Sequence, residues 1–141
     1  MSQPKDNTMK LAFTLSQQTS QFEKRMERSL SIHGISFTEF QVLHQLCHAP
    51  EEKLSRIELA EHINLTASGV TRLLNPVEKN PLVIKEKNQR DARISWVVVT
   101  ETGKEIYDNA LTTFRFGANK LTENLTTKQI DQLLQLLKGL A

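Results

Sequence analysis

One face of the helix predicted to begin at Thr66 carries only small, polar or cationic side chains. Apolar residues recur at i, i+3, i+4 and i+7 from Val70, which turns them toward a core and leaves the other face in solvent. Hydroxyl, amide and guanidinium groups can donate to and accept from base edges in a DNA major groove, and small side chains avoid clashes there. The predicted base contacts are Ser68, Thr71, Arg72 and Asn75.

A basic loop at residues 85–93 follows this helix and lies between two runs rich in β-branched residues, 82–84 and 94–99. Such runs predict a two-stranded hairpin with a charged tip. Residues 66–93 carry a net charge of +3, above the +2 of the whole chain, so positive charge is concentrated here. Contacts with DNA phosphates are expected from this region. The predicted phosphate contacts are Arg56, Lys85, Lys87 and Arg90.

A shorter helix is predicted immediately before the first one. Ser55 and Glu58 have the spacing of a capping box, which starts a helix at this point, and Asn64 ends it. Two helices joined by a tight turn and followed by a basic hairpin are typical of a winged helix-turn-helix. The side chains expected on or near the buried side of the shorter helix are Ile57, Leu59, Ala60 and Ile63.

Two short motifs close this segment: Asp91-x-Arg93 at the hairpin tip, and Thr100-x-x-Gly103 where the second strand meets the next helix. With the order of helices and strands, they resemble the MarR family of bacterial winged-helix transcriptional regulators. The resemblance extends from about Lys10 to the C-terminus. It implies a six-helix fold that dimerises, binds pseudo-palindromic double-stranded DNA, and usually represses transcription until a small molecule or oxidation releases it.

The same resemblance implies roles for particular residues. Arg93 would enter the minor groove from the wing, and Asp91 would brace it. An effector pocket would lie between the dimerisation helices and the DNA-binding lobe, and in relatives it typically takes phenolic or aromatic acids. No cofactor is expected. As a regulator of this kind, the protein would work in the bacterial cytoplasm, associated with the nucleoid.

Long helices are expected at both ends of the chain. Residues 8–31 lack Pro and Gly and would form a helix about 36 Å long. A compact domain of this length is only about 37 Å wide, so one end of the helix should project into a partner subunit. Met1 to Asn7 is polar and is expected to be frayed. The apolar stripe of the helix is Leu11, Leu15, Phe22, Met26 and Leu30.

Three further helices have recognisable starts. Ser36 with Glu39, and Thr126 with Gln129, form capping boxes, and Thr100 can cap a helix by itself. Lys53 and Leu54 are expected to add a short third strand to the wing. The apolar residues expected to face inward are Phe40, Leu43, Leu46 and Cys47 in the first helix, Ile106, Tyr107, Ala110, Leu111, Phe114, Ala118 and Leu121 in the second, and Ile130, Leu133, Leu134, Leu137 and Leu140 in the last.

The fold class predicted is therefore mainly α with a small β-wing. We expect one domain over residues 1–141, with a winged lobe at about 36–100 and dimerisation helices at about 8–32 and 101–141. No apolar run approaches the length of a membrane span. The single cysteine cannot form an internal disulfide, as expected for a protein of the reducing cytosol. An enzyme is disfavoured because no phosphate-binding glycine loop or nucleophile motif is present.

Two prolines depart from the pattern of the resembled family. Pro76 falls inside the predicted recognition helix, where it removes a hydrogen bond at a cost of ~3 kcal/mol unless the helix bends or ends early. Pro81 should stop the helix by Asn80. A winged-helix dimer without specific DNA binding, acting as a protein-interaction module, therefore stays an alternative. The basic wing argues against it.

A second alternative is a regulator that senses metal or oxidation. His44, Cys47 and His48 are spaced at i, i+3 and i+4 on one helix, which can hold a soft transition metal such as zinc. The simpler interpretation places Cys47 in the core beside Phe40 and Leu43, where burial would also suppress its oxidation. Trp96 is expected to be a packing residue.

Overall fold

The computed structural model describes residues 4–63 and 81–140. Its first element is the long helix α1 (Pro4–Leu30), which continues into a short 3-10 turn, Ser31–His33, and ends at Gly34 in the left-handed region at φ 75°. The helix starts four residues earlier than predicted. The expectation of a frayed segment was wrong for residues 4–7, because proline fits the first turn of a helix, where its missing N–H has no partner to lose.

The next elements begin where the capping motifs predicted. Helix α2 (Phe37–Cys47) starts with the Ser36–Glu39 capping box. A 3-10 turn (Pro50–Glu52) leads into strand β1 (Lys53–Ser55) and helix α3 (Arg56–Ile63). At the start of α3, the amide of Ser55 donates to Glu58 and the amide of Glu58 donates to the Ser55 hydroxyl, which confirms this cap as well.

The wing is a three-stranded antiparallel sheet. Strand β2 (Val83–Lys87) and β1 both pair with the central strand β3 (Ser95–Val99), and Lys53 and Ile84 lie on either side of Val98. Helix α5 (Glu101–Leu121) begins at the cap Thr100, and α6 (Thr127–Lys138) begins at the Thr126–Gln129 capping box. The third strand and the starts of α2, α3, α5 and α6 are thus confirmed. The start predicted at Thr66 lies outside the described residues.

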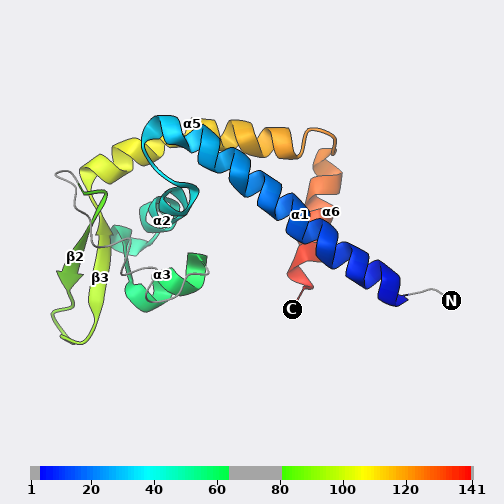
Figure 1. Cartoon of the computed structure of the whole chain (residues 1–141). Coiled ribbons are helices and arrows are strands. Elements are labelled where there is room, and N and C mark those ends of the chain that lie inside the picture. Colours follow the sequence, from blue (N-terminus) through cyan, green and yellow to red (C-terminus); the bar gives the residue numbers. More distant parts are fainter. Residues whose placement is uncertain (1–3, 64–80, 141) are drawn as a thin grey trace.

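Figure 1 shows how these elements are arranged. The sheet, α2 and α3 form a lobe at one end of the molecule, and α5 runs away from this lobe. The C-terminal half of α1 packs on α5, while its N-terminal half extends away from the lobe on the same side as α6. Within the described residues, no helix is both long and apolar enough to cross a membrane.

The hydrophobic core joins α1, α2 and α5 to the inner face of the sheet. Helix α2 packs against α1, α3, α5, β1 and β3. Because it has neighbours on several sides, Val42 is buried, although the predicted inward-facing residues of this helix did not include it. The core residues are Met26, Leu30, Ile35, Phe40, Val42, Leu43, Leu46, Leu54, Leu59, Val83, Val97, Val99, Tyr107 and Ala110.

Several apolar side chains that were expected to face inward are exposed. Ile57 is 73% exposed, because α3 buries Leu59, and a residue two positions away points to the opposite side of a helix. Cys47 is half-buried rather than buried. The remaining exceptions lie toward the ends of the long helices, outside the reach of the core: Leu11 and Leu15 in α1, Leu121 in α5, and Leu133, Leu134, Leu137 and Leu140 at the C-terminus.

Candidate nucleic-acid interface

The tip of the wing is held by hydrogen bonds within the turn that joins β2 to β3. The Asn88 side-chain oxygen accepts from the amides of Arg90 at 2.8 Å and Asp91 at 3.2 Å. The Asn88 amide donates to the Ile94 carbonyl, and the Ile94 amide donates to the Asp91 carbonyl. This local bonding fixes the path of the loop. Sequence reasoning gave Asn88 no role, although an asparagine that opens a turn is a signal for this arrangement.

Asp91 and Arg93 form a fork at this tip. The Arg93 Nε atom donates to Asp91 Oδ1 at 3.1 Å, and Nη2 donates to Oδ2 at 3.2 Å. The Arg93 amide also donates to Oδ1 at 3.0 Å. The guanidinium side chain is 91% exposed, so the fork positions a cation in solvent without burying it. The side-chain bonds from Arg93, and then the bond from its backbone amide, hold the pKa of the Asp91 carboxyl below its usual value, which keeps it ionised.

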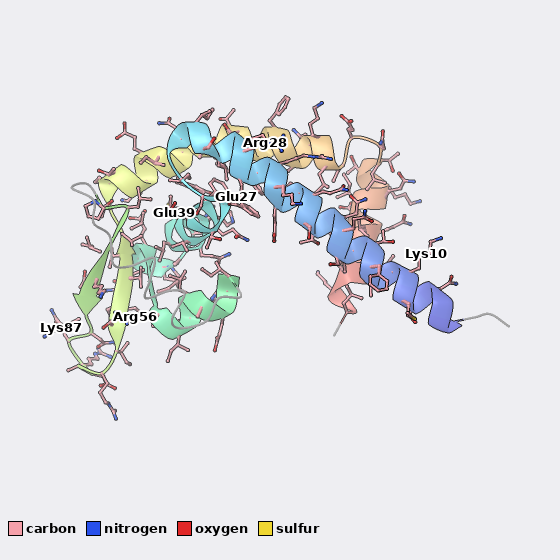
Figure 2. The ribbon with its side chains drawn as sticks, in the orientation of Figure 1. Lys10, Glu27, Arg28, Glu39, Arg56 and Lys87 are labelled. Carbon is pink, nitrogen blue, oxygen red and sulfur yellow. The ribbon has the colours of Figure 1, made fainter. Side chains whose placement is uncertain are left out.

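The other cations of the hairpin are exposed. Lys85 and Lys87 are two positions apart on β2, so they share one face of the strand. Arg90 is exposed in the turn. Arg56 differs from these, because it is half-buried at the first position of α3. Figure 2 labels Arg56 and Lys87 at the same end of the molecule, beside the hairpin. The hairpin and the start of α3 thus place basic groups at one end of the fold.

The wing is tied to α5 through Thr100. Its hydroxyl is 2.8 Å from the Pro81 carbonyl oxygen and 3.0 Å from that of Leu82, and it accepts from the Gly103 amide at 3.0 Å. A Cβ on Gly103 would collide with the Leu82 carbonyl oxygen and lie 2.9 Å from Val99. The Thr100-x-x-Gly103 motif therefore has a structural role. Thr100 caps α5, and the absence of a side chain at Gly103 lets the start of β2 approach this helix.

The predicted base contacts lie outside the described residues. They fall within 64–80, as does Pro76, whose effect on the recognition helix therefore stays a prediction. The residues concerned are Ser68, Thr71, Arg72 and Asn75.

The residues His44, Cys47 and His48 do not converge as metal ligands. His44 Nδ1 lies 2.7 Å from the Tyr107 hydroxyl, and His48 Nδ1 bonds to the backbone carbonyl of His44 at 2.8 Å. Across the described ranges, no three His, Cys, Asp or Glu side chains are grouped to hold a metal. Burial, helped by the nearby Glu52, raises the pKa of the Cys47 thiol to about 11, the opposite of what a reactive cysteine needs.

Trp96 packs on the outer face of the sheet, as predicted. The Lys53 ammonium lies 5.1 Å from the centre of its ring and 3.6 Å from the Glu86 carboxylate. These contacts link all three strands of the wing, because Lys53 is on β1, Trp96 on β3 and Glu86 on β2. A cation over an aromatic face is a modest stabilising contact, so this face is structural.

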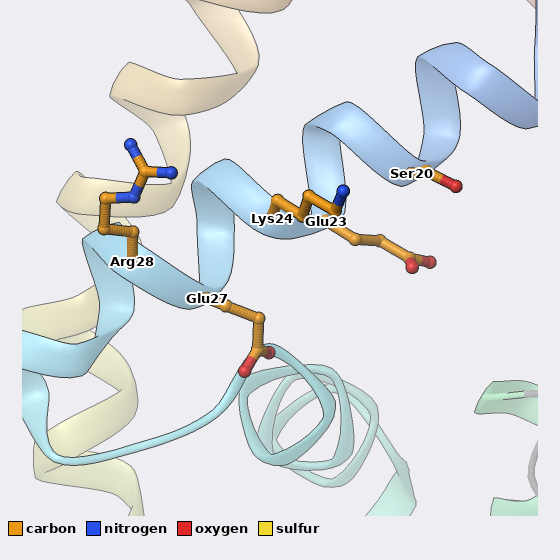
Figure 3. Close-up of a pocket in the computed structure, with 5 residues that line it drawn as sticks. All are labelled: Ser20, Glu23, Lys24, Glu27 and Arg28. Atoms are coloured by element: carbon orange, nitrogen blue, oxygen red, sulfur yellow. The ribbon is translucent and has the colours of Figure 1, made fainter.

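Helix α1 is connected to the winged lobe by Glu27. Its carboxylate accepts from the Phe37 amide at the start of α2 at 2.5 Å, and Figure 3 shows the side chain directed toward that helix. Beside it is an open pocket of about 620 Å³ on the surface of α1. This pocket is lined by Ser20, Glu23, Lys24, Glu27 and Arg28.

Comparison with known proteins identifies the fold and the family. Residues 24–110 match the family model described as the transcriptional regulator SarA/Rot. A relative in Bacillus subtilis, the HTH-type transcriptional regulator MhqR, is 23% identical over 133 residues, which cover 94% of this chain and 90% of the relative. Both the family and this relative are regulators rather than enzymes, as the sequence predicted.

Two solved structures share the fold. Sco3205, a MarR family regulator from Streptomyces coelicolor in complex with DNA, superposes with a TM-score of 0.85 at 19% identity and covers 98% of this chain and 87% of its own. CouR from Rhodococcus jostii, bound to p-coumaroyl-CoA, superposes with a TM-score of 0.80 at 20% identity. This match covers 91% of this chain and 88% of CouR. The mainly helical fold with a β-wing is thus confirmed. The chain has the winged-helix fold of the MarR family structures and belongs to the SarA/Rot family of transcriptional regulators.

Proposed function

We propose that this regulator represses transcription as a homodimer, by binding a pseudo-palindromic operator in double-stranded DNA. In this proposal the winged lobe, about residues 36–100, binds DNA, and the helices at about 8–32 and 101–141 form the dimer. A small aromatic effector changes its DNA affinity. The site of action would be the bacterial cytoplasm, at the nucleoid.

The observation that carries the proposal is the exposed cation at the wing tip. Asp91 holds the Arg93 guanidinium in one orientation before DNA arrives, so less conformational entropy is lost on binding. A minor groove attracts a cation that reaches into it. The proposed phosphate contacts are Arg56, Lys85, Lys87 and Arg90, and the proposed base contacts are Ser68, Thr71, Arg72 and Asn75.

Dimerisation is supported by apolar surface at the two ends of the chain. In α1, Met9 is 59% exposed and Phe13 is 71% exposed, and no residue of α6 is buried. Such surface is costly to leave in water, and a two-fold partner would cover it. A dimer would also present two wings and two recognition helices to half-sites about one helical turn apart.

Effector control is supported by the connection between the two parts of the fold. Glu27 bonds to the start of α2, so a ligand that moves α1 would also move the winged lobe. Binding alters DNA affinity only if the ligand prefers one arrangement of the two lobes over another. CouR, a protein of the same fold, was solved with p-coumaroyl-CoA bound, which is consistent with an aromatic effector here.

The proposal is tested by selecting random duplex DNA with the purified protein. The expected result is an enriched inverted repeat whose half-sites are about one turn apart. Its affinity should persist at physiological salt. The absence of enrichment, with binding that disappears as salt is raised to physiological levels, would leave only charge attraction and favour the interaction-module alternative.

A further inference from the structure

A groove of about 460 Å³ lies between α1 and α5. It shares Arg28 with the pocket in Figure 3, but its other lining residues are different and come from both helices, where they pack against one another. Its volume is within the range of about 300–1,000 Å³ that is usual for small-molecule sites.

The groove owes its shape to the close approach of the two helices at Gly117. A Cβ at this position would lie 2.6 Å from the Met26 sulfur, so a larger residue would displace the Met26 side chain. Met26 is buried beneath the crossing, and Phe22 packs edge-on against Phe114 at 6.2 Å between ring centres. The floor of the groove is therefore apolar.

Three cations surround this floor: Arg25 and Arg28 from α1 and Lys120 from α5. In the described part of the chain none of them forms an ion pair, whereas Lys53, Arg93 and Lys104 do. Glu123 is the one carboxylate among the lining residues, so the groove has an excess of positive charge. Arg28 also lines the pocket in Figure 3, where its side chain points away from Glu27.

Phe116 completes the site. It is 67% exposed although it lines the groove, so a large aromatic surface lies next to the cations. Arginine binds carboxylate and phosphate groups through paired hydrogen bonds, and an aromatic surface favours an apolar body. An anion without an apolar part would leave Phe116 in water, and an apolar molecule without charge would leave the guanidinium groups unused.

We propose that the groove between α1 and α5 binds an organic anion, in which a carboxylate or phosphate contacts Arg25, Arg28 and Lys120 and an apolar group covers Phe116. The proposal extends the effector part of the proposed function and rests on it only for an effect on DNA affinity. Binding itself requires neither DNA nor an operator.

The test is isothermal titration calorimetry of the full-length protein, without DNA, using 2-naphthyl phosphate as the probe. The neutral 2-naphthol and inorganic phosphate are the matched ligands. We expect 2-naphthyl phosphate to bind at least about tenfold more tightly than either, because each of them makes only part of the contacts. Its affinity should fall as salt is added.

Substitutions locate the site. Arg25→Gln and Lys120→Gln, which change only this groove, should each weaken binding about three- to tenfold, as expected for loss of a charge-assisted hydrogen bond. Arg28→Gln should also weaken binding, but Arg28 lines both pockets and does not separate them. Lys24→Gln removes the same charge from the pocket in Figure 3 and should leave the affinity unchanged. An unchanged melting temperature confirms that each variant is folded.

Three results would overturn the proposal: no binding of 2-naphthyl phosphate, equal binding of 2-naphthol, or equal losses in Lys24→Gln and the groove variants. If a partner subunit covered the groove in solution, 2-naphthyl phosphate would not bind. A failure of the proposed operator binding would leave the calorimetry unaffected, so the two proposals fail separately. Conversely, a ligand that binds here and leaves DNA affinity unchanged would remove only its role as an effector.

Discussion

Asp91 and Arg93 are joined by two side-chain hydrogen bonds, at 3.1 and 3.2 Å, at the tip of a hairpin whose turn is itself fixed by Asn88. The pair carries no net charge as a unit, yet the guanidinium is nearly fully exposed. An isolated surface ion pair contributes little to stability, typically 0 to about 1 kcal/mol. The pair therefore adds little to folding, and the role that we propose for it is recognition of DNA.

Replacing Arg93 with alanine should weaken operator binding without changing stability. We expect a loss of about 1–3 kcal/mol in binding free energy, the range for a positioned arginine at a DNA groove, and an unchanged melting temperature. Fluorescence anisotropy with a labelled operator measures the affinity. Arg115→Ala, which removes an exposed arginine from α5, is the control. Equal affinity of wild type and Arg93→Ala would remove the wing from the interface.

The bracing role of Asp91 gives a separate prediction. Asp91→Asn keeps the size of the side chain but weakens both bonds to Arg93, so DNA affinity should fall even though a negative charge has been removed near DNA. The hydrogen bonds from Arg93 also lower the pKa of Asp91, which predicts how DNA binding depends on pH. The carboxylate should stay ionised, and binding should be insensitive to this group, until pH falls below its ordinary value near 4. A gain in affinity for Asp91→Asn would show that its charge only repels phosphates.

Lys85, Lys87 and Arg90 should act through phosphates. Glutamine at each position should weaken binding to specific and random DNA by the same factor. The slope of log affinity against log salt should become shallower by about 0.9 for each phosphate that the variant no longer neutralises. Titrations at several salt concentrations measure both. If a variant changed the sequence preference but not the salt slope, that residue would contact a base and not a phosphate.

The junction between the wing and α5 should tolerate no side chain at Gly103. In Gly103→Ala the new methyl group meets the backbone carbonyl of Leu82, which cannot move aside cheaply, and the side chain of the buried Val99. The expected loss is about 1–3 kcal/mol in the free energy of unfolding, measured by urea denaturation. Gly139→Ala, whose Cβ has its nearest neighbour at 3.3 Å, is the matched control and should cost less. Equal effects would contradict the close packing inferred here.

The apolar face of α6 should be needed for the dimer. Leu134 is 55% exposed and Leu137 is 40% exposed in one subunit, so an aspartate at either position would place a charge in the proposed interface. We expect these variants to sediment as monomers and to lose operator affinity. Gln135→Asp adds the same charge on the polar side of the helix, beside Asp131 in a surface pocket, and should remain dimeric. Monomeric wild-type protein at micromolar concentration would contradict the proposed assembly.

The sequence predicted the local structure well because the signals were local. Ser36, Ser55, Thr100 and Thr126 each begin a helix through a hydrogen bond to a residue three positions later, a pattern that can be seen in the chain itself. The Asp91–Arg93 pair is equally local, although only the family resemblance gave it a role.

Features that depend on packing between distant segments were not predicted. Ile57 was expected to face inward because it is apolar, but α3 turns its other side to the core. Val42 was missed because α2 has neighbours on several sides. The groove beside Gly117 could not be seen either, because nothing in the sequence places Arg28 near Lys120, some ninety residues later.

In the proposed function, two symmetric lobes bind one specific DNA sequence. This is tested most directly by comparing, at physiological salt, the dissociation constants for the selected inverted repeat, for the same duplex with one half-site scrambled, and for a fully scrambled duplex. We predict that the repeat binds at least about a thousandfold more tightly than the scrambled duplex, and that losing one half-site removes most of this preference. Equal dissociation constants for the three duplexes would contradict the account.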